Sequence, residues 1–150
     1  MTWVANGKIG ALWSANQLGT RRPNPYVRAV VLDEAGMGVV AEPDLWSSSY
    51  AYAYPGAHPN EDGTVGVTVF RGGGTRNPGH VAGLLEEPSH TWRLQVAVDG
   101  TNGPLDNTWG DYFTCHQAAP DGSRWVATGF TMQGGKLAAN VQQHIVEFGV

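Results

Sequence analysis

The stretch TWGDYFTCHQAAPDGSRWVATGF, residues 108–130, decides how this chain is expected to fold. Its centre, Pro120-Asp121-Gly122, is typical of a tight reversal, because proline fixes its φ angle and glycine tolerates a positive one. Residues with high β propensity flank the reversal, at 112–114 before it and at 125–130 after it. The stretch therefore predicts a β-hairpin.

The hairpin pattern occurs three times along the chain. Each copy has a turn that ends in glycine, then a polar residue, then an alternating strand that finishes in an aromatic residue. The copies are NGKIGALWSA (6–15), EDGTVGVTVFRG (61–72) and PDGSRWVATGFT (120–131). Their turn glycines, Gly7, Gly63 and Gly122, lie 56 and 59 residues apart. Four short antiparallel strands at a period slightly longer than usual indicate a propeller blade.

Further strand-like runs follow in the same order in each copy. After the strand that follows the turn, each copy has another strand-like run, at 26–32, 81–85 and 143–148. The first two copies continue with a fourth run, at 38–41 and 92–98. The second and third copies also have an opening run before the turn, at 50–57 and 112–118. The first copy has only a short opening run, 3–5. We therefore expect one all-β, partial propeller domain over residues 1–150. Its blade-like units lie at about 1–46, 47–105 and 106–150, and the terminal units are incomplete.

A β-sandwich would also contain several glycine turns, but the agreement in order as well as in period favours blades. Three blades leave open flanks and unpaired strand edges, whereas closed propellers have about 4–8 blades. We therefore expect the ring to be completed in one of two ways. Either a parent chain supplies the missing blades, or a second copy of this chain forms a homodimer with six blades.

Composition argues against two classes of partner. The 150 residues carry a net charge of −4 without a block of Lys or Arg, so we expect no nucleic-acid partner and no anionic membrane surface. No apolar run reaches the roughly 20 residues of a membrane-spanning helix, and Met1 leads into strand-like sequence rather than a signal peptide. The single Cys115 does not indicate a redox compartment. The localisation therefore stays open.

Two segments resemble the sialidase-like (BNR-type) proteins, a family of six-bladed propellers. WGDY (109–112), with the strand, turn and aromatic strand that follow it, resembles their last blades. YAYPGAHPNEDGTVGVTVFRGG (52–73) resembles their penultimate blade. The likeness runs from near residue 50 to residue 150. It implies the propeller fold and makes an extracellular location plausible.

The chain departs from the sialidase pattern at the residues that matter for catalysis. The Asp-box, Ser-x-Asp-x-Gly-x-Thr-Trp, is absent, and the nearest string, 121–125, has a different spacing. The family's enzymes also need three arginines, a Tyr–Glu nucleophile pair and an Asp acid from blades all around the ring. We therefore expect a non-catalytic module that binds a glycan or a protein partner. The alternatives are part of a sialidase-type exo-glycosidase that needs further blades or a second copy, and a purely structural self-assembling unit.

Five residues are candidates for ligand binding. We expect Asp111 and Tyr112 at the start of an inner strand near the channel mouth, with Trp109 as a stacking face. Asp111 could instead accept hydrogen bonds from a neighbouring blade's backbone. Arg71 and Arg76 lie on a glycine-rich loop, where Arg71 could clamp a carboxylate. The alternative is an exposed loop with solvated arginines.

The sequence gives no strong metal site. The loop DGTNGPLDN (99–107) is rich in oxygen atoms and could bind Ca²⁺, but it lacks the EF-hand spacing and a plain turn is favoured. The five histidines show no zinc-type spacing; they are His58, His80, His90, His116 and His144. We therefore expect no cofactor.

Strand alternation decides two further interpretations. Cys115 and the adjacent His116 should face opposite sides of a strand, so Cys115 is expected to be a buried small hydrophobic residue rather than a nucleophile. Tyr50, Tyr52 and Tyr54 alternate with alanines and should share one face. That row would either stack on a sugar or pack between blades.

Overall fold

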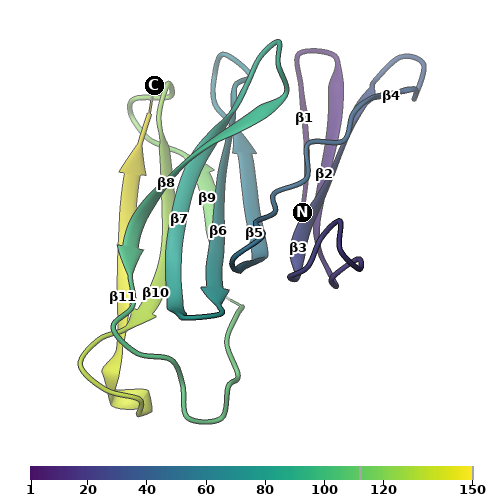
Figure 1. Ribbon diagram of the computed structural model, residues 1–150. Helices are drawn as coiled ribbons and strands as arrows, with labels where there is room; N and C mark the ends of the chain where they lie inside the picture. The colour runs from purple at the N-terminus through teal and green to yellow at the C-terminus, as the bar shows by residue number, and fades with distance from the viewer. Residues whose placement is uncertain (112, 150) are drawn as a thin grey trace.

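In this computed structural model the described residues, 1–111 and 113–149, form three antiparallel β-sheets (Figure 1). The first sheet contains β1 (Thr2–Ala5), β2 (Lys8–Ala15), β3 (Tyr26–Asp33) and β4 (Val39–Ala41). The middle sheet contains β5 (Ala51–Pro59), β6 (Val65–Gly73), β7 (Arg76–Glu86) and β8 (Thr91–Asp99). The third sheet contains β9 (Thr114–Gln117), β10 (Trp125–Met132) and β11 (Val141–Phe148), with a 3-10 turn, η1 (Ala138–Asn140), before β11.

The hairpin turns explain part of the repeat. Asn6 and Gly7 both have positive φ angles, 50° and 69°, and they join β1 to β2 as the two-residue turn that such angles favour. Gly63 also has a positive φ, 78°. Gly122 does not, so its expected role was wrong. A Cβ there would lie 2.5 Å from the ends of the Gln117 and Glu61 side chains, which would have to move aside.

The two central strands of the middle sheet, β6 and β7, are buried on both faces over most of their length. Val65, Val67 and Val69 of β6 point towards the first sheet and belong to the main hydrophobic core. The alternate residues Gly66 and Thr68 point towards the third sheet, where a Cβ on Gly66 would meet Trp125. A strand covered on both sides reads as a nearly continuous apolar run, which is how VGVTVF appears in the sequence.

Large rings lie over glycines where the middle and third sheets meet. The Trp125 indole covers Gly66 of β6, and its Nε1 donates to the backbone oxygen of His58 at 2.8 Å. Conversely, a ring of the middle sheet covers a glycine of the third: the His80 imidazole of β7 lies over Gly129 of β10. Glycine thus lets the two sheets approach closely enough to exclude water from both rings.

The predicted all-β fold and the repetition of antiparallel sheets are confirmed. The middle sheet lies between the other two, and its first strand, β5, contacts both β2 of the first sheet and β9 of the third. Within residues 113–149 the third sheet has three strands. Among the described residues no helix has the length and apolar character needed to cross a membrane.

One expectation about the tyrosines is wrong. Tyr50 and Tyr52 do lie side by side, with ring centroids 5.4 Å apart. Tyr54 does not continue the row, because the β5–β6 register shifts between Ala53 and Gly56 and Tyr54 takes a φ of 54°. This bulge turns the Tyr54 ring towards Phe70 instead, at a centroid distance of 6.2 Å.

Candidate functional site

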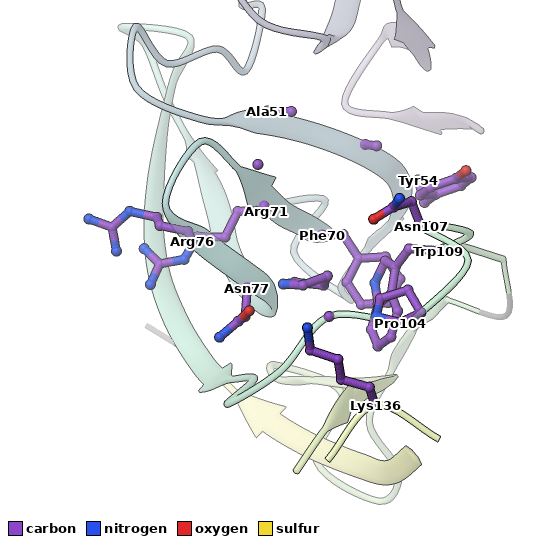
Figure 2. A pocket seen from close by; sticks show the side chains of 15 residues that line it. Ala51, Tyr54, Phe70, Arg71, Arg76, Asn77, Pro104, Asn107, Trp109 and Lys136 are labelled. Carbon is purple, nitrogen blue, oxygen red and sulfur yellow. The ribbon is translucent and has the colours of Figure 1, made fainter. Parts of the chain in front are cut away.

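A pocket of about 500 Å³ lies where the loop after β8 passes over the end of the middle sheet. Four parts of the chain line it: β5, the β6–β7 hairpin, the loop after β8 and the loop after β10. Its aromatic and charged lining residues, which define the Trp109 pocket, are Tyr54, Phe70, Arg71, Arg76, Trp109 and Lys136. Figure 2 shows the two arginines at one end and the three rings at the other.

The β6–β7 hairpin positions the two arginines. Arg71 lies within β6 and Arg76 begins β7, so both belong to strands and not to the glycine-rich loop expected from the sequence. The turn between them is tight because Gly73 and Gly74 have φ angles of 88° and 63°, in the region that favours glycine. Both side chains therefore leave a rigid hairpin at the same end of the pocket.

Arg71 is held by an acidic neighbour. Its Nη2 donates to Oδ1 and Oδ2 of Asp99 at 2.7 and 2.9 Å. The Arg71 side chain is only 11% exposed, whereas the Asp99 carboxylate is 61% exposed. Asp99 thus fixes the orientation of the guanidinium while remaining in solvent itself.

A phenol lies beside both guanidinium groups. The Tyr50 ring centroid is 5.7 Å from Arg71 Cζ and 5.1 Å from Arg76 Cζ. The Tyr50 hydroxyl is 3.4 Å from that of Tyr52, and this hydrogen bond lowers the pKa of Tyr50, with the two positive charges acting in the same direction. Burial raises the pKa of Tyr52, so this tyrosine stays neutral and Tyr50 is the more acidic of the two.

The aromatic end of the pocket is a packed cluster. The Trp109 ring centroid lies 5.3 Å from that of Phe70, edge to face, and 4.6 Å from that of Phe130. Trp109 is therefore half-buried, with part of its ring left to line the pocket. Aromatic clusters of this geometry hold their members in place beyond the effect of burial alone.

Two donors at the pocket lack acceptors. Among the described residues, neither Trp109 Nε1 nor Arg71 Nε has a hydrogen-bond partner, although both atoms are buried. Buried N–H groups are nearly always paired in folded proteins, and exceptions are found where a ligand or water completes the set. Because neither atom is open to solvent, a ligand in the pocket would meet the rest of the Arg71 guanidinium and the Trp109 ring rather than these two N–H groups.

The expected place of Asp111 is wrong. The strand expected to start at Asp111 is β9, which begins at Thr114, and Asp111 precedes it as an exposed loop residue with a φ of 62°. It lines an adjoining pocket of about 490 Å³ that also contains Trp109 and Lys136. Tyr112, the remaining sequence candidate, lies outside the described residues. The structure thus brings Arg71, Arg76 and Trp109 together and sets Asp111 beside them.

None of the protein-family models, curated proteins and solved structures compared with this chain matches it. The sialidase-like resemblance therefore stays a prediction from the sequence. The chemistry of the site has to be judged from its own residues.

Sequence reasoning missed half of the Trp109 pocket. Lys136 follows the glycine pair of the loop after β10, and only the tertiary fold brings it to the pocket. Tyr54 was placed in a tyrosine row, and Phe70 was treated as the end of a strand. No periodic signal could have found Lys136, and the repeat identified Phe70 only as a strand-ending aromatic residue.

The other candidate sites carry little chemistry. Among the residues described, no group of three or more His, Cys, Asp or Glu side chains could hold a metal ion. The expectation for Cys115 is confirmed: it is buried, and burial raises the pKa of its thiol to about 12. His116 is exposed on the opposite face. The Trp109 pocket is thus the best-developed candidate: a preformed recess that combines positive charge with aromatic surface.

Proposed function

We propose that this chain is a binding module that holds an acidic saccharide in the Trp109 pocket and performs no catalysis itself. The observation that carries the proposal is the convergence of Arg71, Arg76 and Lys136 on a pocket that also contains an indole ring. None of the described residues that line this pocket is acidic. Guanidinium groups bind carboxylates through charge-assisted hydrogen bonds, and an aromatic ring offers a flat face to a sugar.

The fixed position of Arg71 supports tight binding. Asp99 occupies Nη2, which leaves Nη1 for a ligand carboxylate. Arg76 and Lys136 form no ion pair with any described residue, so their charges are available. A side chain that is already ordered loses little entropy when it binds. Each hydrogen bond to a charged group contributes about 1.5–3 kcal/mol, which is roughly tenfold or more in Kd.

Binding is the activity that this lining supports best. Glycoside hydrolysis needs a pair of carboxyl groups or an activated nucleophile close to the substrate. One observation favours the alternative, part of a sialidase-type exo-glycosidase: the Tyr50 hydroxyl, with its lowered pKa, lies beside Arg71 and Arg76. Such an enzyme would need acidic residues from further blades.

We also propose that the three stacked sheets are consecutive propeller blades. Their serial face-to-face packing and the central position of β5 support this arrangement. Large apolar side chains are exposed on both terminal sheets: Val4 and Trp13 on the first, at 58% and 46%, and Ile145 on the third, at 79%. Further blades would cover these faces, either from a second copy or from the rest of a longer chain. The native mass of the purified chain distinguishes these two sources.

Calorimetric titration with sialyllactose and with oligogalacturonate tests the proposed function. We expect the chain to bind at least one of these acidic saccharides. Lactose, the neutral counterpart of sialyllactose, should bind far more weakly. Arg71→Ala and Trp109→Ala should each raise Kd about tenfold or more. The matched controls are Arg21→Ala and Trp13→Ala, which remove exposed residues of the same type away from the pocket.

Two results would contradict the proposal. If the wild-type chain bound no acidic saccharide, or if Arg21→Ala weakened binding as much as Arg71→Ala, the pocket would not be the site. Release of a fluorophore from a sialoside by the purified chain would instead favour the exo-glycosidase.

A further inference from the structure

The Trp109 pocket continues into the adjoining recess of about 490 Å³. Four residues line both recesses: Tyr54, Pro104, Trp109 and Lys136. Figure 2 shows Tyr54, Pro104 and Trp109 at the end of the Trp109 pocket that lies away from the two arginines. The arginines line the first recess and not the second. A single elongated ligand can therefore occupy both recesses, with the arginines at one of its ends only.

Most of the side chains that line the second recess are apolar. Its aliphatic residues, which define the Leu137 pocket, are Leu105, Met132, Leu137, Ala138 and Val141. The loop after β8 contributes Leu105 and the loop after β10 contributes Leu137, and these side chains are 66% and 61% exposed. Exposed apolar side chains that gather around one recess, rather than lying singly over the surface, indicate a binding surface. The Leu137 pocket is therefore suited to an uncharged hydrocarbon group.

The charges of the two pockets differ in sign. The described lining of the Trp109 pocket contains three cationic side chains and no acidic one. The Leu137 pocket contains Asp106 and Asp111 in addition to Lys136. Two carboxylates repel a second anionic group, whereas the guanidinium groups attract one. The acidic end of a ligand is therefore directed to the arginines, and the part that reaches the Leu137 pocket carries no negative charge.

We infer that the two pockets together bind an amphipathic glycoside, in which one acidic sugar is joined through its glycosidic bond to an uncharged apolar group. The inference rests on the proposed function, because the acidic sugar is the part held in the Trp109 pocket. Its carboxylate lies at Arg71 and Arg76, and the apolar group extends past the indole ring into the Leu137 pocket. A saccharide with an acid on every unit is disfavoured, because its second carboxylate would meet Asp111. The ligand class is thus narrower than acidic saccharides in general.

Calorimetric titration with matched methyl and octyl glycosides tests the inference. The probes are the glycosides of N-acetylneuraminic acid and of galacturonic acid, kept below the concentrations at which the octyl compounds form micelles. For an acidic sugar whose methyl glycoside binds, the octyl glycoside should bind at least tenfold more tightly, since each buried methylene strengthens binding about fourfold. A dimer of the same acidic sugar should show no such gain. Octyl galactoside, the neutral control, should bind at least tenfold more weakly than the acidic octyl glycoside.

One variant isolates the apolar pocket. Leu137 lies outside the Trp109 pocket, so Leu137→Ser should leave the Kd of the methyl glycoside unchanged. The same variant should reduce the gain from the octyl group to less than about threefold, because it removes apolar surface that the chain covers. Leu18→Ser is the matched control: this leucine, in the connection between β2 and β3, is 56% exposed, and its replacement should keep the full gain.

The outcomes separate this inference from the proposed function. If neither the methyl nor the octyl glycoside of either acidic sugar binds, both proposals are wrong. If a methyl glycoside binds and Arg71→Ala weakens it, but the octyl group adds nothing, the inference alone is overturned. A gain that persists in Leu137→Ser, or equally tight binding of octyl galactoside, overturns it as well.

Discussion

His80, in β7, is fully buried between the middle and third sheets, and its protonation should destabilise the fold in mild acid. Its Nε2 lies against the Thr68 hydroxyl, whose own proton goes to the Val81 carbonyl oxygen at 3.3 Å. Nε2 must therefore carry the imidazole proton. Nδ1 has no partner among the described residues and faces the third sheet. A second proton at Nδ1 would place an uncompensated charge in the core.

Burial therefore lowers the pKa of His80 from 6.5 to about 4, and the nearby His144 acts in the same direction. The unfolded chain binds a proton at higher pH than the native chain, so stability is complete above pH 6.5 and falls as the pH drops towards 4. Linkage gives a loss of about 2 kcal/mol between about pH 7.5 and pH 5, and about 3 kcal/mol by about pH 4. Burial also lowers the pKa of His144, which adds to the same trend.

Urea unfolding at these pH values measures the effect. His80→Gln keeps a donor near Thr68 and should be less stable than the wild type at neutral pH. Because glutamine does not titrate, its free energy of unfolding should fall by about 2 kcal/mol less than that of the wild type on acidification. His116→Gln, at an exposed position, is the matched control and should follow the wild type. The reasoning would be refuted if the His80→Gln and wild-type chains lost the same stability. An NMR titration that placed the pKa of His80 near 6.5 would refute it as well.

Three further predictions concern packing and reactivity. Gly66→Ala forces a Cβ to within 2.5 Å of the Trp125 indole and should lower the free energy of unfolding by about 1–3 kcal/mol, whereas Gly38→Ala, with open space around it, should not. Cys115 should resist a thiol reagent such as DTNB in the native chain and react on denaturation; fast native labelling would contradict its burial. Arg71→Ala should keep a cooperative urea transition, because the Asp99 carboxylate that it releases is mostly exposed, so a variant that failed to fold would contradict a role confined to binding.

The strands could be predicted because their signals are local. Asn6-Gly7 has the turn chemistry that only a tight hairpin satisfies, and it is found with both φ angles positive. The run 65–70 is nearly all apolar because β6 is covered on both faces, and this pattern is visible in the sequence. Short-range turn and alternation rules thus account for most of the fold.

The site could be predicted only in part, because its geometry depends on irregular backbone. Arg71 and Trp109 could be selected from the sequence, the first beside a glycine-rich turn and the second ahead of a strand, and both line the Trp109 pocket. Tyr54 and Asp111 were misplaced because a bulge and a positive φ angle ended the regular alternation at these residues. Lys136 reaches the pocket only through the packing of the third sheet. Such contacts between distant segments leave no trace in local periodicity.

The most direct test of the account is the indole N–H signal of Trp109 in ¹⁵N–¹H NMR during titration with an acidic saccharide. The account predicts a saturable shift of this signal, because a saccharide that packs on the Trp109 ring changes the magnetic environment of the indole. The indole signal of Trp125, which already donates to the His58 carbonyl oxygen, should stay unchanged. A bound saccharide that left Trp109 unaffected and shifted exposed Trp46 instead would contradict the central claim.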